Sequence, residues 1–258
     1  MKKTIFAAAC LAVGLVSCNP SADRLAVWKD YDVGAIEFED KAVGTRGSEI
    51  YHEIIADPED YIAEQARTVL STLYDSPEDS IATVKKLRYT LEDTDGISAK
   101  GGGNGHVNIF YSTRHVEKSF GGGGDVDKVL FETRGVLLHE LTHAYQLEPQ
   151  GIGTYGTNRV FWAFIEGMAD AVRVANGGFG PDARPKGGNY MDGYRTAGYF
   201  FVWLRDNKDP DFLRKFNRST LEVIPWSFDG AVKRILGEEY DIDSLWREYQ
   251  IAVGDIEA

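Results

Sequence analysis

The chain has little cysteine, no long apolar run and no excess of positive charge. Its two cysteines, Cys10 and Cys18, lie near the start, so the rest of the chain has no disulfide bond. We expect core packing or a metal ion to hold it together. The formal net charge is -12, and nucleic-acid phosphates require clustered lysine and arginine. The sequence therefore argues against a nucleic-acid partner.

Proline- or serine-rich linkers and internal repeats are also missing. The 258 residues, with 43% hydrophobic content, are enough for a sizeable packed core. We therefore expect residues 27–258 to form one domain, and we expect the protein to be a monomer.

The first residues are typical of an export signal. Lys2 and Lys3 precede an apolar run that is too short to cross a bilayer as a permanent helix. The sequence "LVSC" resembles the bacterial lipoprotein box, in which signal peptidase cuts before a cysteine that becomes lipidated. Residues 1–17 are thus predicted to be a lipoprotein signal peptide, with Cys18 as the lipidated first residue of the mature protein.

This signal predicts an exported protein that is lipid-anchored to a bacterial cell envelope. We expect the anchor in the outer membrane, on either its periplasmic or its surface face, and residues 18–26 as a tether to the domain. The alternative is an ordinary secretory signal cut near Ser21 or Ala22.

The N-terminal half predicts helices around a small mixed sheet. Residues 57–74 form a helix by their signals, because Asp57 can cap it and Pro58 fits its first turn. Residues 85–93 and 106–112 are predicted to be strands. The glycine clusters at 101–103 and 121–124 lack the Gly-Lys-Ser/Thr of a phosphate-binding loop, so we interpret both as flexible loops.

The C-terminal half predicts mostly helices, which makes the expected fold class α+β. Helical patterns cover 127–147, 159–175, 189–207, 209–219, 229–237 and 241–252. The signal Asn176-Gly177-Gly178 predicts where the second of them ends. Aromatic residues recur at helical spacing and are predicted to be core: Trp162, Phe164, Phe200, Phe201, Trp203, Trp246 and Tyr249.

The sequence "GVLLHELTHAYQ" contains the H-E-x-x-H pattern. His139 and His143 are four residues apart, so on a helix both imidazoles point at one position and suit Zn²⁺. Glu140 then lies beside the ion and can take a proton from water that the ion activates. The alternative is a polar cluster in a core helix, but unpartnered histidines in this apolar setting would be costly to bury.

A catalytic zinc site needs three protein ligands and an open position. The later segment "FWAFIEGMAD" offers Glu166 in an apolar setting, with Asp170 four residues on and on the same helical face. We favour Glu166 as the third ligand, with Asp170 accepting a hydrogen bond from a zinc-bound histidine. The reverse assignment, with Asp170 as ligand, is the alternative.

Several separated segments show a family resemblance. They are "DTDGISA", "VNIFYSTRHVE", "RGVLLHELTHAYQ", "IEGMADAVRV", "GYRTAGYFFVWL" and "LWREYQ". Together they resemble the plant basic secretory proteins and their bacterial relatives, a zincin-like peptidase family, from about residue 30 to residue 250. The resemblance implies a zincin-like fold in which His139, His143 and Glu166 match the metal positions and Glu140 the catalytic glutamate. This chain departs from the family's name in being acidic, and from its plant members in having a lipoprotein signal.

Three further predictions concern the surroundings of the metal. Tyr194 is our first candidate to stabilise the oxyanion, with a packing role as the alternative. The strand at 106–112 is expected to be a sheet edge along which an extended peptide lies. His106 and His115 flank that strand, and we interpret them as surface or turn residues.

These residues together predict a zinc-dependent peptidase, most simply an endopeptidase, that acts on protein, peptide or glycoprotein substrates. Two alternatives remain open at this point. One is a lipoprotein that uses the same cleft to bind protein or glycan without turnover. The other is a zinc hydrolase of a non-peptide amide.

Overall fold

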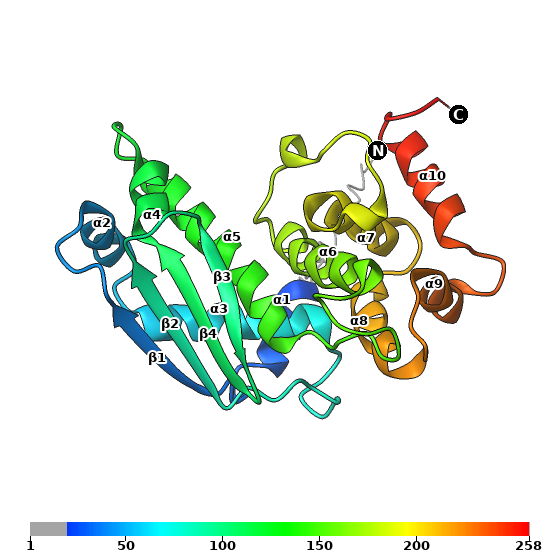
Figure 1. Cartoon of the computed structure of the whole chain (residues 1–258), viewed down its shortest axis with the longest axis horizontal. Helices are drawn as coiled ribbons and strands as arrows, with labels where there is room; N and C mark the ends of the chain where they lie inside the picture. Colours follow the sequence, from blue (N-terminus) through cyan, green and yellow to red (C-terminus); the bar gives the residue numbers. More distant parts are fainter. Residues whose placement is uncertain (1–19, 258) are drawn as a thin grey trace, which may run out of the picture.

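The computed structural model describes residues 20–257, which form helices around a four-stranded sheet (Figure 1). The predicted signal peptide, residues 1–17, and the predicted lipidation site, Cys18, lie outside the described residues. Within the described part, no helix has the length and apolar character needed to cross a membrane.

The sheet and its helices come first along the chain. The elements are α1 (Pro20–Val27), β1 (Ala35–Asp40), α2 (Arg46–Ile54), α3 (Pro58–Leu73), β2 (Lys86–Glu92), β3 (Ser98–Gly103), β4 (His106–Ser112), α4 (Thr113–Phe120) and α5 (Val126–Tyr145). The strand order is β1-β2-β4-β3, and only β3 runs antiparallel to its neighbour. The predicted α+β class and the small mixed sheet are confirmed.

One face of the sheet is apolar and covered by helices. Leu87 pairs with Val107 and Tyr89 with Ile109, and all four side chains are buried. From the same face the hydroxyl of Tyr111 lies 3.3 Å from Oγ1 of Thr133 on α5. The predicted strand at 106–112 is confirmed, and its alternate buried side chains fix α5 against the sheet.

The second half of the chain is helical and lies on the other side of α5 (Figure 1). Its helices are α6 (Arg159–Ala175), α7 (Tyr194–Asn207), α8 (Phe212–Glu222), α9 (Phe228–Leu236) and α10 (Ile242–Ala252), with short 3-10 turns at Pro181–Ala183 and Tyr190–Asp192. Aromatic side chains fill its core, among them Phe164, Phe200, Phe201 and Phe216. Of the predicted core aromatics, Trp162 and Trp203 are only partly buried.

Helix ends follow the predicted signals. Asp57 accepts a hydrogen bond from the backbone N–H of Asp60 at the start of α3, where Pro58 is the first helical residue. At the end of α6, Asn176 is the C-cap and Gly177 has a φ of 75°. The third helical segment begins later than predicted, at Tyr194, after the 3-10 turn.

Several predictions in the N-terminal half were wrong. The glycines at 101–103 form part of β3, because pairing with β4 outweighs their low strand propensity. The strand at 106–112 is not an edge, since β4 lies between β2 and β3. Residues 20–26 of the expected tether belong to α1, which packs against α3. The sequence patterns also missed β1, α2 and α4.

Candidate metal centre

Helix α5 carries both histidines on one face. The Nε2 atoms of His139 and His143 lie 3.1 Å apart, and their rings are nearly perpendicular, at 89°. The N-cap of this helix, Asp125, accepts a hydrogen bond from the N–H of Lys128. Leu138, next to His139, is buried and packs the helix into the core. Local helix geometry and packing therefore keep the two Nε2 atoms close together, facing the same position.

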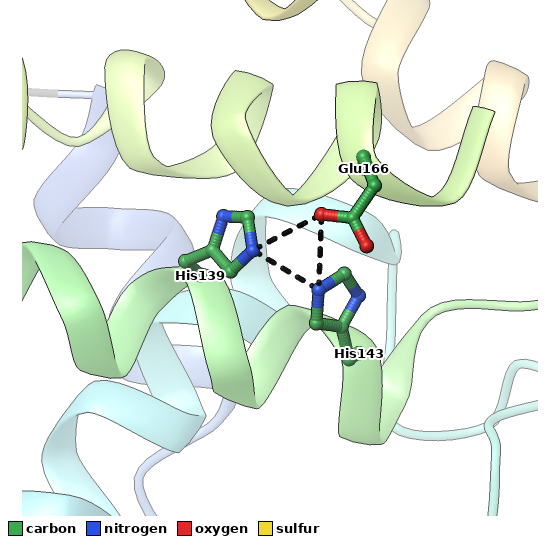
Figure 2. Close-up of side chains that lie close together, drawn as sticks. All are labelled: His139, His143 and Glu166. Atoms are coloured by element: carbon green, nitrogen blue, oxygen red, sulfur yellow. Dashed lines mark hydrogen bonds and ion pairs between the residues drawn. The ribbon is translucent and has the colours of Figure 1, made fainter. Parts of the chain in front are cut away.

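Helix α6 brings a carboxylate to the same point. Oε2 of Glu166 lies 3.4 Å from Nε2 of His139 and 3.6 Å from Nε2 of His143 (Figure 2). Glu166 is only 4% exposed, and its ligand atom and those of the two histidines all lie within 4.8 Å of one another. The three side chains thus form a buried group that can hold a metal ion.

The spacing of these three atoms fits a tetrahedral ion. Bonds of about 2.0–2.1 Å to nitrogen and oxygen place the ligands of a tetrahedral zinc ion about 3.3 Å from one another. The separations of 3.1, 3.4 and 3.6 Å are close to that value. Oε2 of Glu166 is also buried without a hydrogen-bond partner, an arrangement that is costly unless a cation binds there.

The second nitrogen of each histidine has its own partner. Nδ1 of His139 lies 2.7 Å from Oδ1 of Asp170, and Nδ1 of His143 lies 2.8 Å from the side-chain amide of Gln146. Such partners fix the ring orientation of metal-binding histidines. The structure therefore places Glu166 beside the two Nε2 atoms and Asp170 behind His139.

The pKa values of the two histidines are shifted in opposite directions. Burial alone would lower the pKa of His139, but the hydrogen bond to Asp170 and the nearby carboxylate of Glu166 outweigh it and raise the pKa to about 10. Burial lowers the pKa of His143 below its usual value. Burial opposes ionisation of Glu166, but the two histidine rings beside it hold the pKa of this carboxyl well below its usual range.

A cleft of about 390 Å³ opens onto the three side chains. Its lining residues come from β3, α5, α6, α7 and the loop between α5 and α6: Ser98, Ala99, Lys100, His139, Glu140, His143, Gln146, Glu148, Tyr155, Phe161, Ile165, Glu166 and Tyr194. Glu140 is 7% exposed and reaches the same cleft as the histidines. A substrate in the cleft can therefore meet the metal position, Glu140 and the edge strand β3 together.

Tyr194 also faces this cleft. Its ring is parallel to that of His139, with centroids 6.0 Å apart, and Trp162 packs edge-on against it at 5.5 Å. The backbone turns sharply here, since Tyr194 has a φ of 42° and Gly193 a φ of 64°. A Cβ at Gly193 would lie 2.8 Å from the Trp162 ring, so glycine is required for this approach.

The remaining histidines of the predicted site region lie elsewhere. His106 is exposed at the start of β4, and Nε2 of His115, on α4, lies 3.6 Å from Oε2 of Glu132. Neither belongs to the group around Glu166.

Two residues at the centre were not predicted from the sequence. The hydroxyl of Tyr155 donates to Oε1 of Glu166 at 2.7 Å, and Gln146 contacts His143 as described above. Gln146 is the C-cap of α5, three residues after His143, so its spacing was a usable signal. Tyr155 lies in an irregular loop, and nothing in its local sequence indicates the contact.

Comparison with known protein families finds a match over most of the chain. The family model described as "Peptidase of plants and bacteria" (BSP) matches residues 33–249, which include every residue of the centre. The resemblance noted in the sequence is thereby confirmed. No curated protein and no solved structure matches the chain.

Proposed function

The chain belongs to the BSP family, the peptidases of plants and bacteria, and we propose that it is a zinc-dependent endopeptidase with a zincin-like fold. The observation that carries the proposal is the convergence of His139 Nε2, His143 Nε2 and Glu166 Oε2 at the separations of a tetrahedral site. Two imidazoles and a carboxylate suit Zn²⁺, and three protein ligands leave a position open for catalysis. When bound, the ion supplies Lewis-acid chemistry, which polarises a carbonyl group and lowers the pKa of water.

Glu140 is the general base in this proposal. It follows His139 directly in α5 and reaches the cleft, so its carboxylate lies beside the metal position without being one of the three converging ligands. Glu140 takes a proton from the attacking water and passes it to the nitrogen of the leaving amine.

Tyr194 is the proposed donor to the oxyanion. It is 46% exposed, lines the cleft and has its ring parallel to that of His139, so it borders the space that a substrate would occupy. A hydroxyl placed there stabilises the negative charge that develops on the carbonyl oxygen.

The edge strand β3 orients the substrate. Ser98, Ala99 and Lys100 line the cleft, and β3 pairs on one side only, with β4. An extended peptide can add to the free side through backbone hydrogen bonds. We therefore propose that the substrate lies along β3 rather than along 106–112.

We also propose that the protein is exported and lipid-anchored to the bacterial cell envelope through Cys18. Replacing Cys18 by serine should move the protein from the membrane fraction to the soluble fraction. A Cys18→Ser protein that stays with the membrane would contradict the anchor and leave the peptidase proposal unaffected.

The catalytic proposal is tested by Glu140→Gln. We expect full zinc content and a kcat on a cleaved peptide lowered by about 100-fold or more, because only the proton acceptor is lost. A suitable control is Glu53→Gln, which removes an exposed carboxylate on α2 and should leave kcat unchanged. Full activity of Glu140→Gln would show that the mechanism is wrong.

A further inference from the structure

The two oxygens of the Glu166 carboxylate have different surroundings. Oε2 faces the two histidines and has no hydrogen-bond partner, whereas Oε1 accepts a hydrogen bond from Tyr155 at 2.7 Å. Figure 2 shows one oxygen turned toward the two rings and the other turned away from His139. One oxygen is therefore free for an ion while the other is already held by the protein.

Tyr155 is held in place by a structured loop. The loop joins α5 to α6, and the N–H of Thr157 donates to the carbonyl of Thr154 at 3.0 Å, which closes a turn around Tyr155. Asn158 ties this turn to α6, since its amide donates to the carbonyl of Ile152 and its oxygen caps the N–H of Val160. The tyrosine is 46% exposed, so packing alone does not fix its ring, but the turn fixes its backbone.

Binding through one oxygen matters for the reaction. A carboxylate that binds with both oxygens fills a coordination position that a catalytic zinc site needs for water or substrate. A hydrogen bond to Oε1 opposes the rotation of the carboxylate that would bring this oxygen to the ion. It also keeps Oε2 pointed at the two Nε2 atoms, as outer partners do for other metal ligands.

We propose that Tyr155 is a positioning residue, which holds Glu166 as a one-oxygen ligand and keeps the fourth position of the metal open. The inference rests on the proposed function in so far as Glu166 is a zinc ligand. Tyr155 differs in this from Tyr194, which lies on the same cleft with the same exposed fraction of 46% but stacks on His139. One tyrosine acts through a ligand, and the other acts on the substrate.

The test measures zinc affinity separately from catalysis. Zinc Kd is measured for the wild type and for Tyr155→Phe by competition with a coloured chelator. We expect Tyr155→Phe to raise Kd about 10- to 100-fold, the usual range when an outer partner of a ligand is lost. Tyr240→Phe is the control, because the hydroxyl of Tyr240 lies in the α9–α10 loop, away from the cleft, and its loss should leave Kd unchanged.

Two further readouts separate positioning from other roles. With Co²⁺ in place of zinc, the visible absorption of Tyr155→Phe should change from a four-coordinate to a five-coordinate pattern, because the released carboxylate binds with both oxygens. At saturating zinc, its kcat should stay about 10-fold below wild type, because the second carboxylate oxygen fills the position that water or substrate needs. Tyr194→Phe should instead keep the wild-type Kd and Co²⁺ spectrum and lose about 100-fold or more in kcat.

The outcomes are distinct. An unchanged Kd and an unchanged Co²⁺ spectrum in Tyr155→Phe would overturn the inference, as would a low kcat at saturating zinc with an unchanged Kd, which would make Tyr155 a donor to the substrate. A wild-type protein that binds zinc but cleaves no peptide would refute the proposed function, while the Kd comparison would still decide the role of Tyr155. A melting temperature of the zinc-free variant equal to that of wild type confirms that it is folded.

Discussion

The sheet half and the helical half of the molecule contribute to the centre in different ways. From the sheet half, α5 supplies His139, Glu140 and His143, whose relative placement is fixed within a single turn of helix. From the helical half, α6 supplies Glu166 and Asp170, which reach the histidines only because α5 and α6 pack together. The group that can hold a metal ion therefore lies between α5 and α6, the helices at which the two halves meet (Figure 1).

The difference shows which part of the site depends on tertiary packing. Two histidines four residues apart would face one point in any helix, but an open two-ligand pair does not make a catalytic zinc site. Glu166 completes the group across the α5–α6 contact. The account therefore predicts that the integrity of the site and the packing of the two halves are coupled.

The largest effect is expected from removing one ligand from each half. His143→Ala and Glu166→Ala should both lose stoichiometric zinc and all detectable peptide hydrolysis. Zinc at 100 times the wild-type Kd should stabilise the wild type by about 2.7 kcal/mol and should not stabilise the variants. Metal analysis and thermal melts measure this, with Glu64→Ala on α3 as the control. Zinc retained by Glu166→Ala would assign the site to the sheet half alone, and zinc retained by His143→Ala would show that this histidine is not a ligand.

The next effect concerns the partners of the two histidines. Asp170→Asn removes a charged acceptor from His139 and should raise the zinc Kd about 10- to 100-fold. Gln146→Ala removes a neutral partner from His143 and should cost less, because hydrogen bonds to charged groups are the stronger ones. Chelator competition gives both values. If Gln146→Ala lost more zinc affinity than Asp170→Asn, the expected order of the two effects would be wrong.

A packing change at the helical half should be smaller. A Cβ at Gly198 on α7 would lie 2.9 Å from the backbone of Asp170 and Ala171 on α6. We expect Gly198→Ala to lower the free energy of unfolding by about 1–3 kcal/mol, because the two backbones must separate. In the sheet half, a Cβ at Gly101 meets nothing within 4 Å, so Gly101→Ala should stay within about 0.5 kcal/mol. Urea unfolding of both variants tests the contrast, and equal stabilities would refute it.

The last prediction needs no change in the sequence and concerns the dependence of metal affinity on pH. His139 in the metal-free protein has a pKa raised to about 10, so below that pH it carries a proton that must leave when zinc binds. His143, whose pKa is lowered, adds no such proton at neutral pH. Zinc affinity should therefore rise about tenfold per pH unit between pH 7 and 9. Calorimetry in buffers of different ionisation enthalpy should report about one proton released, and an affinity that falls with pH would contradict this.

The sequence predicted the local features well and the long-range features less well. The α5 histidines, the cap at Asp57 and the stop at Asn176 follow from spacing along one element, and the structure has them. The glycines of β3 were predicted to be a loop, because strand formation there depends on pairing with β4 rather than on local propensity. For the same reason β4 was mistaken for an edge strand.

The contact of Tyr155 with Glu166 could not be predicted from the sequence. The two residues are 11 positions apart, and the contact depends on the path of an irregular loop. Glu166 itself could be proposed because a carboxylate in an apolar helix needs a partner. Its distance from the histidines, however, is set by the packing of α5 against α6.

The most direct test of the central claim is a crystal structure with anomalous diffraction measured at the zinc absorption edge. The account predicts one zinc peak within about 2.0–2.2 Å of Nε2 of His139, Nε2 of His143 and Oε2 of Glu166. No peak at this position, or a zinc ion bound by Asp170 in place of Glu166, would contradict it.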